Sequence, residues 1–252
     1  MPTTVKLYHR PDKDRPRPVA SVDLPSDYAY VSPSEDAVVE TPFGPLLLVE
    51  VATGGNCMAC EKLLPLRVDG ERLVPVEPDD PRIALREVTA SDPDVIITGF
   101  LNTFESYGPL CHACSPSTTI HLKLDKGGRL AEACDRSRDD YASDALAAKD
   151  ELAALADSAA QGTKPDDQAA SDLFAGAIAR TLDRLNAGEA VTAVLPDFRA
   201  TVDQAQAVAD PRFVAELGKA ATALADGLTA AGAAGRLARA CPALGVDRPA
   251  GL

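Results

Sequence analysis

The sequence predicts an α+β protein in which a β-rich part is followed by an α-helical part. The composition is that of a globular protein, with 46% hydrophobic and 25% charged residues. Before about residue 136, β-branched residues, Pro and Gly divide the chain into short apolar runs, and after it alanine-rich segments with helical spacing dominate. We therefore expect a β-rich domain over 1–136 and a helical bundle over 137–252.

Short apolar runs in the first part predict a set of β-strands. The run at 46–51 is apolar on both faces for most of its length, which predicts a central, buried strand. Ile120, Leu122 and Leu124 alternate with polar residues, and a turn with two glycines follows at 125–128, so this region predicts a hairpin. The predicted strands are 3–8, 19–24, 37–40, 46–51, 72–76, 95–98 and 118–124, with 129–133 closing the hairpin.

The second part predicts about three to five helices. Phe174, Ile178 and Leu182 lie on one stripe at helical spacing. Asp210 followed by Pro211 is typical of a helix start, with an N-cap and then a first-turn proline. The predicted helical segments are 140–159, 169–186, one opened by Pro196, and one opened by Asp210. A core rich in Ala, Leu and Val favours close helix packing over a large ligand pocket.

Charge and hydropathy limit the partners and the compartment. The formal net charge is -13, and an acidic surface repels phosphate backbones and anionic lipid, which disfavours nucleic-acid and membrane-surface binding. No apolar run approaches the ~20 residues that span a bilayer, so the sequence predicts no membrane segment. Residues 1–6 show neither a charged leader nor an apolar h-region, so the sequence predicts a cytoplasmic protein. In a reducing compartment, paired cysteines more often bind metal or do redox chemistry than form structural disulfides.

Four of the six cysteines form two Cys-x-x-Cys pairs, Cys57 with Cys60 and Cys111 with Cys114. Two such pairs can supply four thiolates to one tetrahedral ion at ~2.3 Å, and binding lowers the thiol pKa values. The pattern resembles the two knuckles of a zinc-ribbon-type site, over about ten residues around each pair. The spacer between the pairs is longer than the about 15–20 residues of compact ribbons, so a strand-bearing insertion would have to fill it. The resemblance implies a structural zinc ion, and iron could occupy the same four thiolates.

The remaining cysteines and the histidine of the second pair receive simpler interpretations. His112 lies inside the second pair and is a candidate to donate a hydrogen bond beside the metal. Cys134 and Cys241 are each isolated in the sequence, so they are predicted to be small buried core residues.

The first cysteine pair also supports a redox interpretation. An apolar run, the pair itself and Pro65 five residues later resemble the strand, active-site pair and helix of thioredoxin-like proteins. This resemblance implies that Cys57 is the nucleophile, Cys60 the resolving thiol and Pro116 the residue that shapes the substrate groove. The chain departs from that pattern at Asn56, where an aromatic residue is usual, and in its long helical second part.

The sequence favours a non-enzymatic function. Zinc would fix the loops at 54–61 and 108–116, while the helical part would bind a protein partner or self-associate. The chain has three histidines and no Ser-His-Asp arrangement, so hydrolytic catalysis has little support. The main alternative is a thiol–disulfide oxidoreductase that uses Cys57 and Cys60.

Overall fold

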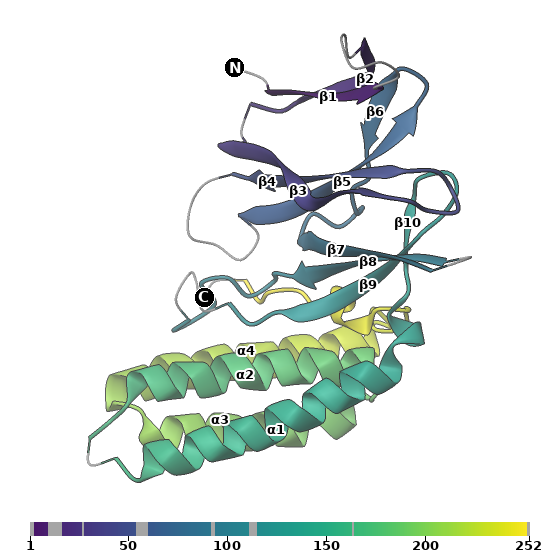
Figure 1. The fold of residues 1–252 in the computed structure, drawn as a ribbon. Helices are drawn as coiled ribbons and strands as arrows, with labels where there is room; N and C mark the ends of the chain where they lie inside the picture. The colour runs from purple at the N-terminus through teal and green to yellow at the C-terminus, as the bar shows by residue number, and fades with distance from the viewer. Residues whose placement is uncertain are drawn as a thin grey trace. The chain divides into compact units, whose positions relative to one another are not determined.

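The computed structural model describes residues 3–9, 17–26, 28–53, 60–91, 94–110, 115–162 and 164–250. Within these ranges the strands lie in the N-terminal half and four α-helices lie in the C-terminal half, which confirms the predicted mixed α and β organisation (Figure 1). Among the described helices, none is both long enough and apolar enough to cross a bilayer.

Six strands form the first sheet, in the order β1-β2-β6-β5-β4-β3. Its strands are β1 (Thr3–His9), β2 (Arg17–Leu24), β3 (Tyr30–Val39), β4 (Leu46–Ala52), β5 (Glu61–Asp69) and β6 (Arg72–Pro75). The predicted run at 46–51 is confirmed as an interior strand, because β4 pairs with both β3 and β5. Val49 and Val51 of β4 pack with Leu64 and Leu66 of β5 in one hydrophobic core.

Four strands form the second sheet, in the order β10-β9-β8-β7. They are β7 (Ile83–Ser91), β8 (Asp94–Leu101), β9 (Thr118–Leu124) and β10 (Leu130–Glu132). The predicted hairpin is confirmed, since the Asp125 carboxylate accepts the N–H groups of Gly127 at 2.8 Å and Arg129 at 2.9 Å and so closes the turn between β9 and β10. The hydrogen bond from the Arg129 N–H is the main cause that lowers the pKa of Asp125.

The helices are α1 (Arg138–Ala160), α2 (Asp167–Asn186), α3 (Val191–Val208) and α4 (Pro211–Ala233), with short 3-10 turns η1 (Cys134–Arg136) and η2 (Pro242–Gly245). The predicted start at Asp210 is confirmed, because its carboxylate accepts the Arg212 N–H at 2.9 Å. The predicted start at Pro196 is wrong. Helix α3 begins at Val191 and contains Pro196 as its sixth residue, where the missing N–H costs the helix one hydrogen bond.

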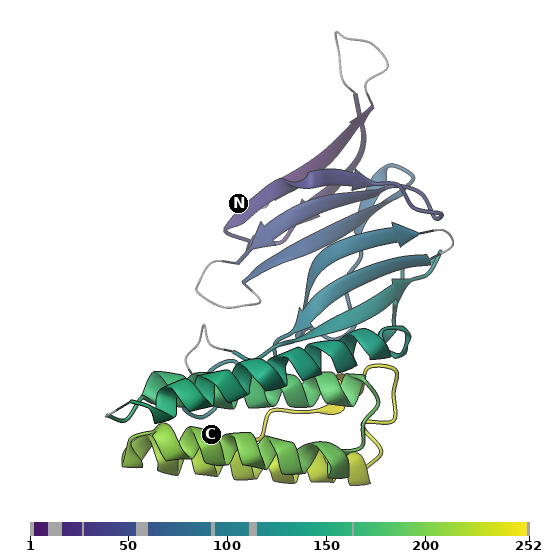
Figure 2. The same cartoon turned by 60° about the horizontal axis from the view of Figure 1, so that its bottom comes forward.

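The chain divides into two compact units, which we call the strand unit and the helical unit. The strand unit comprises 1–100 and 122–131, and the helical unit comprises 101–121 and 132–252. The compositional change near residue 136 lies close to the point where the chain enters the helical unit for the last time. Figure 2 shows the four helices lying side by side, with α2 packed against both α1 and α3.

Aromatic residues form the centre of the helical unit. The rings of Tyr107 and Phe174 lie 6.3 Å apart, and those of Phe174 and Phe198 lie 6.5 Å apart. The Tyr107 hydroxyl donates to the Ala220 carbonyl at 2.7 Å, so the only polar atom of this buried ring is satisfied. Burial raises the pKa of Tyr107 above its ordinary value.

Candidate functional site: an apolar hollow in the helical unit

A hollow of about 900 Å³ opens at one end of the helical unit. It is bounded by the end of α2, the first turns of α3, the last turns of α4, the segment after α4 and the start of α1. Hydrocarbon groups form most of its wall, the largest being Leu185, Val191, Leu195, Leu237 and Pro242. The volume falls within the range of roughly 300–1,000 Å³ that is typical of small-molecule sites.

Two glycines end the helices that border the hollow. Gly188 follows α2 with φ +94°, and Gly235 follows α4 with φ +69°, a backbone conformation that favours glycine. After α4, the Gly235 N–H donates to the Gly232 carbonyl at 3.1 Å and the Arg236 N–H to the Ala231 carbonyl at 3.0 Å. This pair of bonds is a Schellman motif, which reverses the chain so that the segment after α4 returns along the helix ends.

A disulfide between Cys134 and Cys241 holds that returning segment. Both cysteines are fully buried, at 0% exposure. The Cys134 N–H donates to Cys241 Sγ at 3.3 Å, and the Tyr141 hydroxyl lies 3.2 Å from Cys134 Sγ. The prediction that both cysteines are buried core residues is confirmed, and the disulfide that joins them was not predicted. Their separation of 107 residues gives no local spacing signal.

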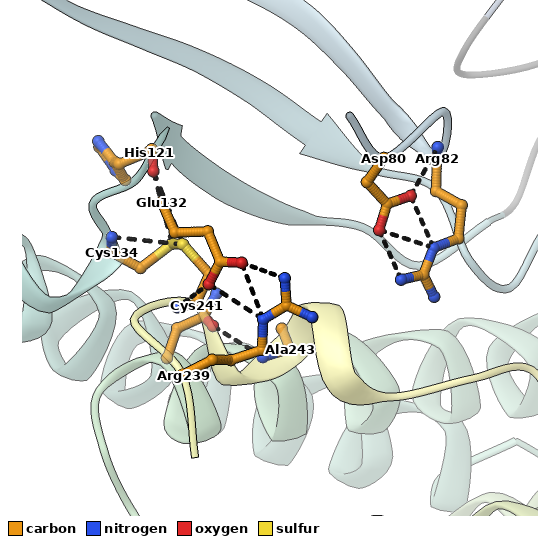
Figure 3. Close-up of polar contacts among 9 residues, drawn as sticks. Asp80, Arg82, His121, Glu132, Cys134, Arg239, Cys241 and Ala243 are labelled. Carbon is orange, nitrogen blue, oxygen red and sulfur yellow. Dashed lines mark hydrogen bonds and ion pairs between the residues drawn. A yellow bond between two sulfur atoms is a disulfide. The ribbon is translucent and has the colours of Figure 1, made fainter. Parts of the chain in front are cut away.

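An ion pair stabilises the same segment next to the disulfide. The Arg239 Nε donates to both carboxylate oxygens of Glu132, at 2.9 and 3.0 Å, and its Nη2 also contacts that carboxylate. The Cys241 N–H donates to Glu132 at 3.0 Å, so one carboxylate binds two residues of the segment (Figure 3). The two side chains are partly exposed, at 37% for Arg239 and 25% for Glu132.

A second ion-pair network fixes the turn between α2 and α3. Arg184 donates to the two carboxylate oxygens of Glu189 at 2.8 and 2.6 Å and to Asp197 at 2.7 Å. The hydrogen bond with Glu189 is the main cause that raises the pKa of Arg184, and it also lowers the pKa of Glu189. The Glu189 carboxylate, which borders the hollow, is therefore already neutralised by a protein cation.

Buried polar residues fasten the 3-10 turn η2 to α2. The Asn186 side-chain carbonyl accepts the Ala243 N–H at 3.0 Å, and its amide donates to Thr118 Oγ1 at 3.5 Å. Asn186 is 1% exposed, so these bonds satisfy a side chain that has lost its water. The backbone of Gly245 lies so close to Arg236 that an added Cβ would be 2.2 Å from the Arg236 carbonyl oxygen. Only glycine permits this approach.

The strand unit contains a smaller hollow of about 500 Å³. Charged residues of both signs, among them Glu50, Lys62 and Arg86, line it together with apolar residues of β4 and β5. It therefore offers a more polar surface than the hollow of the helical unit.

The predicted zinc ligands are only partly described. Cys57, Cys111 and Cys114 lie outside the described residues, as does His112. Cys60 is described, is 8% exposed and is disulfide-bonded, with a partner that lies outside the described residues. A cysteine in a disulfide has no thiolate to give to a metal. Within the described part of the chain, no group of three or more His, Cys, Asp or Glu side chains could hold a metal ion.

The thioredoxin-like resemblance implied a helix after Cys60, and this prediction is wrong. Residues Glu61–Asp69 form strand β5, in which Pro65 lies opposite Leu48 of β4. The order of strand, cysteine pair and helix does not occur at this place in the chain. Pro116 is buried just before β9.

The Ala-, Leu- and Val-rich composition favoured close helix packing over a ligand pocket, so the hollow was not predicted. The glycines after α2 and α4 were available signals for the chain reversals, but not for the space that they enclose. The disulfide had a weaker signal: once two pairs are set aside, Cys134 and Cys241 are the cysteines that remain to pair with each other. Comparisons of the chain with protein-family models, with curated proteins and with solved structures found no match.

Proposed function

We propose that the protein is a non-enzymatic binding protein whose helical unit holds a small apolar ligand in the hollow. The observation that carries this proposal is the hollow itself, about 900 Å³ in volume and walled mainly by hydrocarbon groups. Moving apolar surface out of water contributes about 25 cal/mol per Å², so a ligand that covers this wall gains affinity without a specific polar contact.

The walls of the hollow support binding because they are fixed before a ligand arrives. The Cys134–Cys241 disulfide, the Glu132–Arg239 ion pair and the Arg184–Glu189 ion pair each hold a bordering segment. A site that is already ordered loses little conformational freedom when it binds, and this raises affinity.

The chemistry of the lining supports a binding role over a catalytic one. The residues that line the hollow include no His, Cys, Ser, Lys or Tyr. Of its charged groups, Glu189 and Arg239 are held in ion pairs. The hydroxyl groups of this lining are those of Thr192 and Thr229, and the Thr229 hydroxyl already donates to the Ala225 carbonyl at 2.8 Å. The lining therefore offers no His, Cys or Lys, the side chains that most often act as base or nucleophile in group transfer.

Binding of 1-anilinonaphthalene-8-sulfonate to two matched variants tests the proposal. Ala233 and Ala230 are both exposed alanines of α4, and Ala233 lines the hollow whereas Ala230 does not. We expect one dye per chain to bind the wild type, Ala233→Phe to weaken binding about tenfold or more by filling the hollow, and Ala230→Phe to leave it unchanged. Equal affinities in all three proteins would contradict the proposal.

A protein partner for the helical unit is a second candidate function, which the rim of the hollow favours. Asp135 and Arg138 are exposed residues of opposite charge at its border. An apolar centre with a polar rim is the usual anatomy of a protein interface. The partner that this rim fits best is a second copy of the chain, because charges of both signs can pair across a two-fold axis. Light scattering should then show a dimer that Ala233→Phe dissociates, and a monomer at every concentration would exclude it.

A structural zinc ion bound by Cys57, Cys60, Cys111 and Cys114 stays a separate proposal that the cysteine pattern supports. The metal form would require reduction of the disulfide that Cys60 makes in the structure. Elemental analysis of protein purified without chelator should find one zinc per chain, lost in Cys60→Ser.

The oxidoreductase alternative predicts instead a metal-free protein that reduces insulin disulfides and loses this activity in Cys57→Ser. A metal-free protein without that activity would exclude both.

A further inference from the structure

We propose that oxidation of Cys134 and Cys241 forms the hollow, so that the protein matures where thiols are oxidised. This inference rests on the proposed function, because it concerns the formation of the same site. The disulfide joins two parts of the wall directly. Cys134 precedes Asp135, and Cys241 lies between Ala240 and Pro242, and these three neighbours all line the hollow.

The other contacts of the wall segment are weaker constraints. The Glu132–Arg239 ion pair is partly exposed, and water and salt weaken such pairs. The Asn186–Ala243 hydrogen bond is buried but holds only η2. Without the disulfide, the segment from Leu237 to Ala240 is held by the hydrogen bond from the Ala238 N–H to the Gly235 carbonyl at 3.1 Å and by the partly exposed Glu132–Arg239 pair, and beyond it by the buried η2. We therefore expect this wall to detach in the reduced protein.

The oxidation is a balanced thiol–disulfide exchange with a small or protein disulfide as oxidant. One cysteine thiolate attacks a sulfur of the oxidant, forms a mixed disulfide and releases one thiol. The second thiolate then attacks its partner's sulfur and releases the second thiol, so that two electrons and two protons pass from the pair to the oxidant. Because both cysteines are 0% exposed in the folded chain, this exchange must precede final packing, and the finished bond is shielded from reductants.

The one other described cysteine, Cys60, is oxidised as well. Cys60 is also disulfide-bonded, and the described residues include no free cysteine. Structural disulfides persist in oxidising compartments and are rare where glutathione and thioredoxin keep thiols reduced. The cytoplasmic location expected from the sequence is the alternative that this inference opposes.

The test compares full-length protein refolded with oxidised glutathione and with a thiol reductant. Alkylation under denaturing conditions identifies free thiols at Cys134 and Cys241, and anilinonaphthalene sulfonate reports the hollow. We expect the reduced protein and the variant Cys134→Ala/Cys241→Ala to bind the dye about tenfold more weakly or not at all. The control Cys60→Ala, which changes a disulfide-bonded cysteine of the strand unit that does not line the hollow, should bind like the wild type. Full dye affinity with both thiols free would overturn the inference and leave the proposed function intact.

Amide hydrogen exchange of residues 236–246 gives a readout that does not depend on a ligand. We expect slow exchange in the oxidised protein and fast exchange in the reduced one, whether the reduced protein loses only this segment or its whole fold. Equal protection in both forms would overturn the inference. If no preparation binds the dye but exchange still depends on oxidation, the proposed function fails while the disulfide-formed wall stands.

Discussion

The hydroxyl of Thr118 donates to a carboxylate oxygen of Asp183 at 2.5 Å and so joins the first residue of β9 to α2. Thr118 is 2% exposed. Burial of the Asp183 side chain raises its pKa from 3.8 to about 6, the Thr118 hydrogen bond opposes this rise, and the nearby charge of Asp144 adds to it. The helical unit therefore contains a carboxyl group that keeps its proton to a higher pH when the chain is folded than when it is unfolded.

This raised pKa predicts that the protein becomes less stable as the pH rises from about 4 to 6. Below that window the carboxyl is protonated in both states and contributes no pH dependence. Within it, the folded chain retains a proton that the unfolded chain has lost, so stability falls by at most roughly 2–3 kcal/mol. Asp183→Asn should flatten this dependence in urea denaturation series over about pH 4 to 7. Asp139→Asn, at an exposed position of α1, is the matched control, and equal slopes in the wild type and Asp183→Asn would refute the assignment.

Loss of the Tyr141 hydroxyl should destabilise the protein by about 1–2 kcal/mol. This hydroxyl donates to the Thr119 carbonyl at 2.7 Å and lies 3.2 Å from Cys134 Sγ, so Tyr141→Phe leaves a carbonyl without its partner. Chemical denaturation measures the change. Tyr107→Phe is a useful comparison, because its hydroxyl makes a similar bond to Ala220 at 2.7 Å away from the disulfide. An unchanged midpoint for Tyr141→Phe would show that the hydroxyl contributes nothing.

Removal of the Cys134–Cys241 disulfide should cost about 4–5 kcal/mol of stability. The two cysteines are 107 residues apart, and in the chain-entropy model a bond across so long a loop restricts the unfolded chain strongly. Denaturation of Cys134→Ala/Cys241→Ala against the oxidised wild type measures this effect. A loss below about 1 kcal/mol would mean that the unfolded chain is already compact in this region or that the native bond is strained.

Local patterns explain how much of this fold could be predicted from the sequence. The alternation of Ile120, Leu122 and Leu124 predicted strand β9, because one face of the strand is buried and the other is not. The capping sequence at Asp210 predicted the start of α4 for an equally local reason. Strand β5 was missed, since Pro65 and the charged residues at its start conceal a strand that pairing with β4 stabilises.

Long-range features could not be predicted in this way. The hollow depends on where the segment after α4 comes to lie, and this is decided by contacts to residues far away in the sequence. Glu132 with Arg239 and Cys134 with Cys241 are both 107 residues apart. A single sequence shows that such residues exist but not which of them meet. The predicted zinc ligands stay a prediction, because three of the four lie outside the described residues.

Substitution of Gly108 by alanine should destabilise the helical unit for two separable reasons. Gly108 has φ +56°, which strains an L-residue by about 1 kcal/mol. An added Cβ would also lie 2.6 Å from the Ala220 Cβ, so α4 would have to move away. Overpacking of this kind typically costs a further 1–3 kcal/mol, or roughly 2–4 kcal/mol in total.

The two causes can be measured separately by comparison with Gly70. Gly70 has a similar φ of +59°, but an added Cβ would meet nothing within 4 Å, so Gly70→Ala reports the backbone strain alone. We expect Gly108→Ala to lose more unfolding free energy than Gly70→Ala. The variant Gly108→Ala/Ala220→Gly should recover part of that difference, because it removes the atom that the new methyl group meets. If Gly108→Ala and Gly70→Ala cost the same, α4 does not pack against Gly108 as closely as the structure has it.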